Sequence, residues 1–560
     1  MIKLLNDFKD DTNTLSPIEN FMMKENGLSI NDYQRNFPDL NQKYRYFSFK
    51  DIIPTFSKLT NTDKFVKFVL DNSKKKFVIA GDYDTDGIMS VLIFMIVFRK
   101  LGISVDYVTP NRLSEGYGMS ESLVDRAIEK GAQCIITVDN GISCFDSVAY
   151  AKSKGIDVFI TDHHLPTEGS VPENVEIVDP AYNHDNFQGI CGAFVAAKLA
   201  KALMDAYHVD DQYLLQEIFT YAAIATVTDM MPVLNENRLL LRASFNYVNF
   251  IKEKKVWCRT LKVISSLGGR FFMGDPDRLS SEDLYGYSIG PTINAVSRVE
   301  GDVEGLIYNM LTCDERGKWI DKEYENINSE RKRRTQEMMA NHVRSKDPVD
   351  IEILDESAYD FPISGLTGLI AGQVSNLERK VSLVGYDNNG EYELSCRSIP
   401  GYNLHDAYER IRESHPELNL NGGGHASAMG IRLPAEPELL NQFKQLIIED
   451  FNNHKGDVLA KNYLKFDDDQ IDGIVNTLQK YEVFGNGFKA PQFVYRGEFK
   501  GFSNNVKTAA IGDYSFKYFT TEDSAYNYLN KEVEVYFSIK FDSKNGPYFK
   551  VDNIKRLNNK

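Results

Sequence analysis

Four short polar patches in the N-terminal half of the chain carry side chains that could do chemistry. They contain alternating aspartates, single aspartates or adjacent histidines, and each follows or closes a run rich in Val, Ile or Ala. The patches are Asp82-Tyr83-Asp84-Thr85-Asp86-Gly87, Val138-Asp139-Asn140-Gly141, Asp162-His163-His164 and Thr228-Asp229. So many carboxylates can share one site only with a cation between them, because like charges oppose ionisation. Oxygen ligands with histidine suit Mn²⁺ or Mg²⁺ better than a thiolate-preferring ion.

The apolar runs before these patches predict the buried strands of a parallel sheet. We expect strands at 77–81, 104–109, 134–139, 157–162 and 175–179, with helical periodicity after most of them, as at 88–101 and 120–130. This alternation predicts a doubly wound α/β domain over residues 51–245. Ligands bind at the carboxyl ends of such strands, so the four patches should meet there.

Each patch also has a purely structural interpretation. One aspartate before a helix is typically a cap or an Asx turn, and Asp139 before Asn140-Gly141 is typical of a turn at a strand end. Asp229 could equally cap a helix. A structural role explains less well the three alternating aspartates after one apolar strand and the adjacent histidines after another. Burying charged side chains costs desolvation energy, and the sequence shows no basic partner beside the aspartates that would offset it. Together the patches favour a metal site.

Composition indicates a large multidomain protein. The chain has 560 residues, 42% hydrophobic and 26% charged, enough for roughly three or four domains. We find no membrane span and no signal peptide, which predicts a cytoplasmic location. Six scattered cysteines without a C-x-x-C pair indicate reduced thiols. Because the net charge is −16, any positively charged surface that binds nucleic acid must be confined to a small part of the protein.

Changes in composition divide the rest of the chain. Residues 1–50 are polar with amphipathic stretches, and 246–345 are mainly helical and end in a charged segment typical of an exposed connecting helix. Residues 346–455 return to a mixed α/β pattern. Residues 465–560 show short strands with turn signals, which predicts a small all-β barrel.

The predicted barrel interleaves aromatic residues with Lys and Arg. This pattern suits base stacking along a single strand, although alternating aromatics in strands more often form a core. The residues are Tyr495, Phe499, Phe502, Tyr514, Phe516, Tyr518 and Phe519, with Arg496, Lys500, Lys507 and Lys517. Both interpretations remain open for them.

The four patches together resemble the DHH phosphoesterase superfamily, and further motifs resemble its RecJ branch. The motifs are Pro110-Asn111-Arg112, Glu115-Gly116-Tyr117-Gly118, Gly290-Pro291-Thr292-Ile293-Asn294-Ala295 with Arg298, Asn328 with Arg331, Ser395-Cys396-Arg397-Ser398, Gly422-Gly423-Gly424-His425-Ala426 and Phe484-Gly485-Asn486-Gly487. The resemblance implies a DHH domain, a helical connector, a DHHA1 domain and an oligonucleotide-binding (OB) barrel. It also implies a single-strand-specific 5′→3′ DNA exonuclease that uses two Mn²⁺ or Mg²⁺ ions, releases 5′-mononucleotides and acts in DNA repair or recombination.

The same resemblance implies residue roles. The implied metal ligands are Asp84, Asp86, Asp139, His163 and Asp229, with Asp139 bridging two ions. Asp82 would support the metal ligands without binding an ion itself, and His164 would contact the scissile phosphate or support a ligand. The implied substrate-binding residues are Arg112, Asn294, Arg298, Ser395, Arg397, Gly423, Gly424 and His425. Of these, Arg298, Ser395 and Arg397 should hold a 5′-terminal phosphate, which suits the bidentate fork of arginine.

Two other functions remain open. A nanoRNA or small-nucleotide phosphodiesterase would not need the barrel, and an inactive replisome scaffold would normally lack some of the metal ligands. The resemblance implies single-stranded DNA as the main partner, with a single-strand-binding protein or a helicase as candidate protein partners. We expect a monomer in the cytoplasm, or in the host cytoplasm if the chain is phage-encoded.

Overall fold

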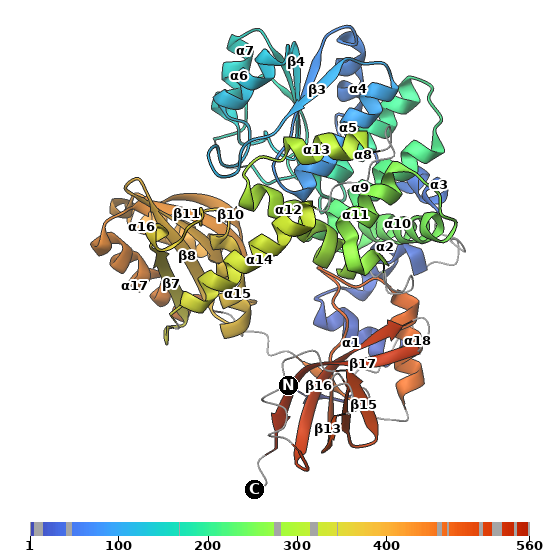
Figure 1. Cartoon of the computed structure of the whole chain (residues 1–560), viewed down its shortest axis with the longest axis vertical. Coiled ribbons are helices and arrows are strands. Elements are labelled where there is room, and N and C mark those ends of the chain that lie inside the picture. The colour runs from blue at the N-terminus through green and yellow to red at the C-terminus, as the bar shows by residue number, and fades with distance from the viewer. Residues whose placement is uncertain are drawn as a thin grey trace.

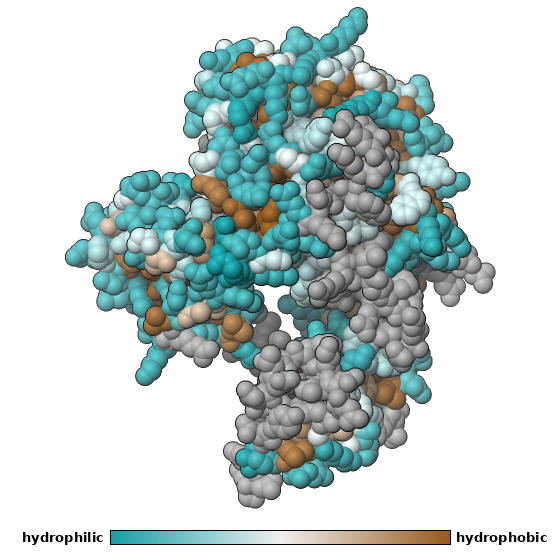
Figure 2. All heavy atoms as spheres, in the orientation of Figure 1, coloured by the Kyte–Doolittle hydropathy of each residue, from teal (hydrophilic) through white to brown (hydrophobic). Residues whose placement is uncertain are grey.

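The chain forms an upper α/β unit, a mixed α/β unit beside it and a β-barrel below them (Figure 1). The computed structural model describes residues 2–4, 15–40, 48–166, 169–273, 282–313, 323–343, 345–455, 462–466, 470–502, 508–517, 529–542 and 546–557. Figure 2 shows an opening in the molecular surface below the contact between the upper and mixed units. Within the described ranges, no helix is both long and apolar enough to cross a membrane.

The upper unit contains a parallel sheet with the strand order β3-β2-β4-β5-β6. Its strands are β2 Phe77–Ala80, β3 Val105–Val108, β4 Cys134–Val138, β5 Asp157–Thr161 and β6 Glu176–Val178. Every neighbouring pair is parallel. The predicted parallel sheet is confirmed, and each predicted strand differs from the observed one by a single residue at most at either end.

Side chains of this sheet alternate between two hydrophobic cores, which is why the strands are apolar throughout. In β2, Phe77 and Ile79 face one core, while Val78 and Ala80 face the other. The first core is covered by α4 Thr62–Asp71, α5 Thr85–Lys100, α8 Gly192–Ala206 and α9 Gln212–Thr228, and the second by α6 Glu121–Glu129 and α7 Phe145–Ser153. This is the predicted doubly wound fold, and its strand order reverses between β2 and β4.

A helical region connects the upper and mixed units. It comprises α10 Asn235–Glu253, α11 Arg259–Met273, the π-helix η6 Glu282–Ile289, α12 Gly290–Val299, α13 Glu304–Thr312 and α14 Glu323–Asn341. Helix α14 crosses to the mixed unit (Figure 1). Near its start, Asn328 Nδ2 donates to Thr292 Oγ1 of α12 at 3.1 Å, and near its end Met338 is buried in a core of the mixed unit. The predicted connecting helix therefore packs on α12 of the helical region at one end and on the mixed unit at the other.

The mixed unit contains a sheet with the order β10-β11-β9-β8-β7. Its elements are β7 Val349–Leu354, α15 Thr367–Glu378, β8 Val381–Asn388, β9 Glu391–Arg397, α16 Leu404–Ser414, β10 Asn421–His425, β11 Ala428–Pro434 and α17 Pro437–His454. Val381 and Leu383 of β8 face the core with α16 and α17, while Val384 and Tyr386 face α15. Strand β10 is left at one edge of the sheet.

The C-terminal sheet closes into a small barrel, as predicted. Strand β13 pairs with both β14 and β16, and β15 and β17 complete the ring. The strands are β12 Tyr463–Lys465, β13 Phe493–Phe502, β14 Thr508–Ile511, β15 Tyr514–Lys517, β16 Glu532–Asp542 and β17 Gly546–Arg556. Strand β1, Ile2–Lys3, pairs with β12 and so joins the N-terminus to this sheet. The sequence did not predict that pairing, because it joins opposite ends of the chain.

The N-terminal segment links the barrel region to the upper unit. Its elements are α1 Pro17–Glu25, η2 Ile30–Asp32, α2 Tyr33–Asn36, η3 Pro38–Leu40, α3 Phe49–Ile52 and η4 Ile53–Thr55. Glu19 of α1 accepts a hydrogen bond at 2.7 Å from Lys480 of α18, Ile471–Tyr481. Arg238 of α10 is buried, pairs with Asp39 at 2.7 Å and donates to the carbonyl of Val483 at 2.8 Å.

Candidate functional site

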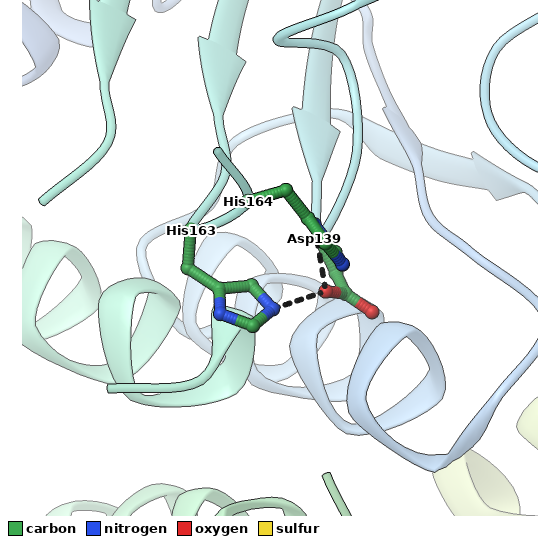
Figure 3. Close-up of side chains that lie close together, drawn as sticks. All are labelled: Asp139, His163 and His164. Atoms are coloured by element: carbon green, nitrogen blue, oxygen red, sulfur yellow. Dashed lines mark ion pairs between the residues drawn. The ribbon is translucent and has the colours of Figure 1, made fainter. Parts of the chain in front are cut away.

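Three strand ends and one helix end bring the predicted carboxylates and histidines to one edge of the parallel sheet. The strand predicted before Asp229 is wrong: the apolar run there is the last part of helix α9, which ends at Thr228. His163 Nε2 lies 3.1 Å from Asp139 Oδ1, 3.5 Å from Asp86 Oδ2 and 3.6 Å from Asp229 Oδ2. Figure 3 shows His163 and His164 approaching the Asp139 carboxylate from neighbouring positions. We call the following residues the acidic cluster: Asp82, Asp84, Asp86, Asp139, His163, His164 and Asp229.

Backbone amides orient the carboxylates of the first patch. Asp84 is the N-cap of α5, and its Oδ1 accepts from the amides of Asp86 and Gly87 at 2.9 and 3.1 Å. The cap interpretation is therefore correct for Asp84. The Asp86 carboxylate accepts from the amides of Gly192 and Ala193, both at 2.7 Å, at the start of α8. Free amides at a helix N-terminus thus hold a carboxylate in the cluster.

The turn after β4 aims Asp139 into the cluster. Asp139 has a left-handed backbone, with φ of 60°, which aspartate and asparagine tolerate better than most residues. Asn140 Nδ2 donates to the carbonyls of Ala80 and Val138 at 3.1 and 2.9 Å, which fixes the turn between β2 and β4. The turn interpretation of this patch is correct, and the turn also positions a cluster carboxylate.

The aspartate of the Asp162-His163-His164 triplet orients the two histidines. Its Oδ1 lies 2.7 Å from His164 Nδ1 and accepts from the His163 amide at 2.8 Å. Burial opposes a charged imidazole, but Asp162, together with Asp229 and Asp86, outweighs it and raises the pKa of His164 to about 10. Tyr117 was named only as part of a motif, yet its hydroxyl lies 3.2 Å from His164 Nδ1 and donates to the Asp139 carbonyl at 3.1 Å.

Asp229 occupies an unfavourable position for a carboxylate without a cation. It is the C-cap of α9, so its charge lies at the negative end of the helix dipole. Its Oδ2 is buried and has no hydrogen-bond partner in the described part of the chain. The plain cap interpretation does not explain such a carboxylate, whereas a bound cation would.

The cluster concentrates negative charge that the protein does not balance. Burial and repulsion from neighbouring carboxylates raise the pKa of Asp82, Asp139 and Asp229 well above the ordinary aspartate value. The same two effects raise the pKa of Asp86 to about 6. Burial also lowers the pKa of His163 to about 3, which leaves this imidazole neutral. A cation would offset the repulsion and accept the lone pair of His163.

The donor atoms fit divalent cations. Asp82 Oδ1, Asp139 Oδ1 and His163 Nε2 are buried without a hydrogen-bond partner among the residues described. Candidate ligand atoms form two sets, and within each set the atoms lie within 4.8 Å of one another. One set is Asp86, His163 and Asp229, and the other is Asp82, Asp84 and Asp139. The two sets adjoin where His163 contacts Asp139. Oxygen and imidazole donors suit Mn²⁺ or Mg²⁺. Asp82, expected behind the ligands, is itself placed as a candidate ligand.

Four arginines gather beside the cluster. Burial and the charge of Arg112 lower the pKa of Arg298 well below the ordinary arginine value, and Arg397 and Arg331 act in the same direction. The guanidinium of Arg112 also lies 4.6 Å from the Tyr83 ring centroid. None of the four pairs with a carboxylate of the described residues. We call them the arginine pocket, and such a group of guanidinium ions suits a phosphate.

Other residues predicted to bind substrate lie around this pocket. Ser395 and Arg397 belong to β9, and Ser395 Oγ lies 3.0 Å from Thr367 Oγ1 at the start of α15. Asn294 also contacts the protein, since its Oδ1 accepts from the amide and hydroxyl of Thr85 at 2.8 and 2.9 Å. Asn294 therefore fixes the first turn of α5, next to the cluster.

The glycine run lies on the edge strand of the mixed unit. Strand β10 contains Gly423, Gly424 and His425. The ring centroid of His425 lies 6.5 Å from that of His164, with the two rings inclined by 12°. A Cβ added to Gly423 would meet nothing within 4 Å, so its backbone is open to a ligand. The mixed unit therefore faces the acidic cluster across a short gap.

A cavity of about 620 Å³ extends from the arginine pocket to the barrel. Its lining includes Thr228 beside the cluster, Asn294 and Arg298 of α12, and Lys540 and Lys550 of the barrel. The lysines come from strands β16 and β17. Sequence reasoning did not assign these two lysines, because nothing local to their strands indicates that they face a site far away in the sequence.

Several barrel aromatics form a core instead of a stacking surface. Phe499 and Phe516 are 1% and 0% exposed. The rings of Tyr495 and Tyr514 pack together with centroids 5.1 Å apart. The core alternative is therefore correct for these residues. Lys507, Tyr518, Phe519 and the side chain of Phe502 lie outside the described residues.

Comparison with solved structures shows a shared fold over most of the chain. The crystal structure of Thermus thermophilus RecJ in complex with Mn²⁺ has a TM-score of 0.72 and 19% identity, and the match covers 97% of this chain and 76% of that one. A crystal structure of exonuclease RecJ bound to manganese has a TM-score of 0.55 and 24% identity, over 70% of this chain and 95% of that one.

Comparison with sequences shows the family. The model of the DHH family N-terminal domain matches residues 76–226, and that of the DHHA1 domain matches 365–453. The single-stranded-DNA-specific exonuclease RecJ of Haemophilus influenzae is 28% identical over 86% of each chain. That of Escherichia coli is 31% identical over 72% of this chain and 71% of its own length. The predicted resemblance is confirmed, and the chain belongs to the RecJ family of DHH-domain proteins.

Proposed function

We propose that this chain is a single-strand-specific 5′→3′ DNA exonuclease of DNA repair or recombination that hydrolyses phosphodiester bonds with divalent cations. One observation carries the proposal: the buried carboxylates of Asp86 and Asp139 and the partly buried one of Asp229 face His163 within 3.6 Å, beside arginines that lack carboxylate partners among the residues described. The first feature suits catalytic cations and the second a phosphate. Relatives named single-stranded-DNA-specific exonuclease support the substrate.

The acidic cluster would hold the cations. Asp86, Asp139, His163 and Asp229 face one position, and Asp82 and Asp84 join Asp139 around a neighbouring one. Mn²⁺ or Mg²⁺ is the expected ion, because relatives have been crystallised with each and the donors suit both. Two such ions would supply an activated water and would stabilise negative charge in the transition state.

Protein groups would position the scissile phosphate. Asp162 Oδ1 lies 2.7 Å from His164 Nδ1 and favours the protonated imidazole against the effect of burial. Tyr117 supports the same imidazole at 3.2 Å. We assign His164 a hydrogen bond to a phosphate oxygen, which strengthens as negative charge develops there. His425, with its ring 6.5 Å from that of His164, closes the other side of the site.

The arginine pocket would recognise the end of the strand. Arg298 and Arg397 can donate charge-assisted hydrogen bonds to a 5′-terminal phosphate, with the Ser395 hydroxyl beside them. A fixed binding site for the terminal phosphate would place the first phosphodiester bond beside the acidic cluster. This arrangement gives 5′→3′ polarity and release of mononucleotides. The cavity towards Lys540 and Lys550 then receives the rest of the strand.

Digestion of labelled oligonucleotides tests the proposal. With Mn²⁺, a single strand carrying a 5′-terminal radioactive phosphate should release that label as a mononucleotide from the first turnover. A blunt duplex of the same sequence should resist. Preference for dinucleotides over long strands would favour a small-nucleotide phosphodiesterase instead, and no cleavage of any substrate would favour an inactive scaffold. Loss of cleavage in Asp139→Asn under the same conditions links the activity to the acidic cluster.

A further inference from the structure

A second group of metal-ligating side chains lies in the mixed unit, at the far end of α14. His342 follows that helix, Asp350 and Glu352 lie on one face of β7, and Glu378 is the last residue of α15. Candidate ligand atoms of His342, Asp350 and Glu352 lie within 4.8 Å of one another. These residues take no part in the acidic cluster or the arginine pocket.

The imidazole of His342 is buried and aimed at two carboxylates that it does not hydrogen-bond. Its side chain is only 4% exposed. Its Nε2 lies 3.8 Å from Asp350 Oδ2 and 3.6 Å from Glu378 Oε1, beyond hydrogen-bond range. Nε2 and Asp350 Oδ2 are both buried without a hydrogen-bond partner in the described ranges. Two facing polar atoms left unpaired inside a protein indicate a missing ligand.

The opposite nitrogen of His342 is already fixed. Nδ1 lies 2.6 Å from Glu352 Oε2. A carboxylate that accepts the Nδ1 proton leaves the Nε2 lone pair free and oriented, as in many protein sites where histidine binds a metal. With the proton on Nδ1, the Nε2 lone pair would face Asp350 and Glu378, which is the tautomer that a cation needs.

Charge and spacing fit a small cation. Three carboxylates face His342, while Lys380 Nζ lies 3.5 Å from Glu378 Oε2. Glu378 also lies at the C-terminal end of α15, where the helix dipole favours a positive charge. A transition-metal ion bound at about 2.0–2.2 Å holds two ligand atoms roughly 3–4 Å apart. The observed 3.6 and 3.8 Å are in that range.

We propose that His342, Asp350 and Glu378 hold a divalent transition-metal ion, with Glu352 orienting the imidazole. Such an ion would join three elements of the mixed unit: the end of α14, strand β7 and the end of α15. Helix α14 carries Arg331 of the arginine pocket, and α15 begins at Thr367, 3.0 Å from Ser395. The ion would therefore fix two helices whose other parts border the proposed phosphate site.

Metal binding by the full-length chain tests this site apart from catalysis. The background variant replaces Asp84, Asp139 and His163 by Ala, which disables the acidic cluster. After chelator treatment, equilibrium dialysis against Zn²⁺ and, separately, Mn²⁺ should give about one bound ion per chain. Zn²⁺ should bind more tightly, following the usual affinity order of these ions. A background variant that binds neither ion would overturn the proposal.

Two near-isosteric changes locate the ion. Asp350→Asn and Glu378→Gln remove ligand charge with little change of volume, and each should lower the affinity for Zn²⁺ at least about tenfold. His415→Ala is the matched control, because His415 also pairs with a glutamate, Glu417 at 3.0 Å, but is more exposed. Unchanged affinity in both near-isosteric variants, with circular dichroism showing a folded chain, would contradict the site. The result does not depend on exonuclease activity.

Discussion

Asp139 packs directly against Gly192. A Cβ added to Gly192 would lie 2.8 Å from Asp139 Cβ and 3.0 Å from Asp139 Oδ1. The amide of the same glycine donates to Asp86 at 2.7 Å. A residue without a side chain therefore positions two carboxylates of the acidic cluster, one by close approach and one by a hydrogen bond.

Gly192→Ala should consequently displace both carboxylates. We expect kcat on a single-stranded oligonucleotide to fall by about 100-fold, because small misplacements of catalytic groups have effects of that size. The control is Gly305→Ala, where an added Cβ would meet nothing within 4 Å. Steady-state cleavage of both variants is the measurement. Parental kcat in Gly192→Ala would show that this contact does not set the geometry of the cluster.

Asp139→Asn should remove activity without removing the fold. Asparagine keeps the shape of aspartate and tolerates the left-handed backbone at this position, so it is a cleaner substitution than alanine. We expect cleavage to fall roughly 10³-fold or more, because a shared metal ligand is weakened. In chelator the variant should be at least as heat-stable as the parent, because burial raises the pKa of the carboxyl that it replaces. Cleavage within about tenfold of the parent would remove Asp139 from the proposed site.

Strand-end chemistry was predictable from the sequence because it is local. The apolar run that ends at Ala80 and the aspartates that follow it are consecutive, so the parallel sheet and its polar edge could be inferred together. The sequence also left caps and turns open as alternatives. Asp84 and Asp139 turn out to serve both purposes, because a capping or turning aspartate can still direct its carboxylate into the cluster.

Contacts between distant segments were not predictable in the same way. The amide of Gly192 on Asp86 and the side chain of Asn294 on Thr85 join residues far apart in sequence, with no pattern in either segment to indicate the pairing. The link from Arg238 to Val483 is of the same kind. Because of this link, deleting the chain from about residue 465 would test more than the loss of the barrel. The deletion would also leave the buried guanidinium of Arg238 without its carbonyl partner.

Arg397→Ala should reduce recognition of the strand end. We expect kcat/KM to fall most for 5′-phosphorylated strands, by about 10- to 100-fold, because each charge-assisted hydrogen bond contributes about 1.5–3 kcal/mol. Arg432→Ala is the control, since that arginine lies on the neighbouring strand and pairs with Glu393 at 2.9 Å. Paired assays on 5′-phosphate and 5′-hydroxyl strands decide the matter. An equal loss on both would assign Arg397 another role.

Lys540→Glu with Lys550→Glu should weaken binding of long strands. Both lysines line the cavity that extends from Arg298, and reversing their charge should raise KM and reduce the dependence of binding on salt. Strands too short to reach the barrel should be cleaved as before. Lys555→Glu is the control on the strand that carries Lys550, because its ammonium lies 5.0 Å from the Tyr536 ring centroid and outside the cavity lining. Unchanged KM and salt dependence in the double variant would separate the barrel from the DNA path.

Metal-induced stabilisation should increase with pH. The pKa of Asp86 is raised to about 6 in the metal-free fold, so its contribution to metal-free stability is present at low pH and lost as the pH rises through about 6. Protons compete with Mn²⁺ for the same carboxylates below that pH. The rise in Tm on adding Mn²⁺ should therefore be larger at about pH 7.5 than at about pH 5. A shift independent of pH would contradict binding at these carboxylates.

Cleavage by chelator-stripped protein, titrated with Mn²⁺, tests the central claim most directly. The stripped parent should not cleave a 5′-phosphorylated single strand, and Mn²⁺ should restore cleavage in step with binding measured on the same sample. Asp139→Asn should remain inactive at every Mn²⁺ concentration that saturates the parent. Cleavage that persists in chelator, or parental cleavage by Asp139→Asn, would show that the acidic cluster is not the metal-dependent nuclease site.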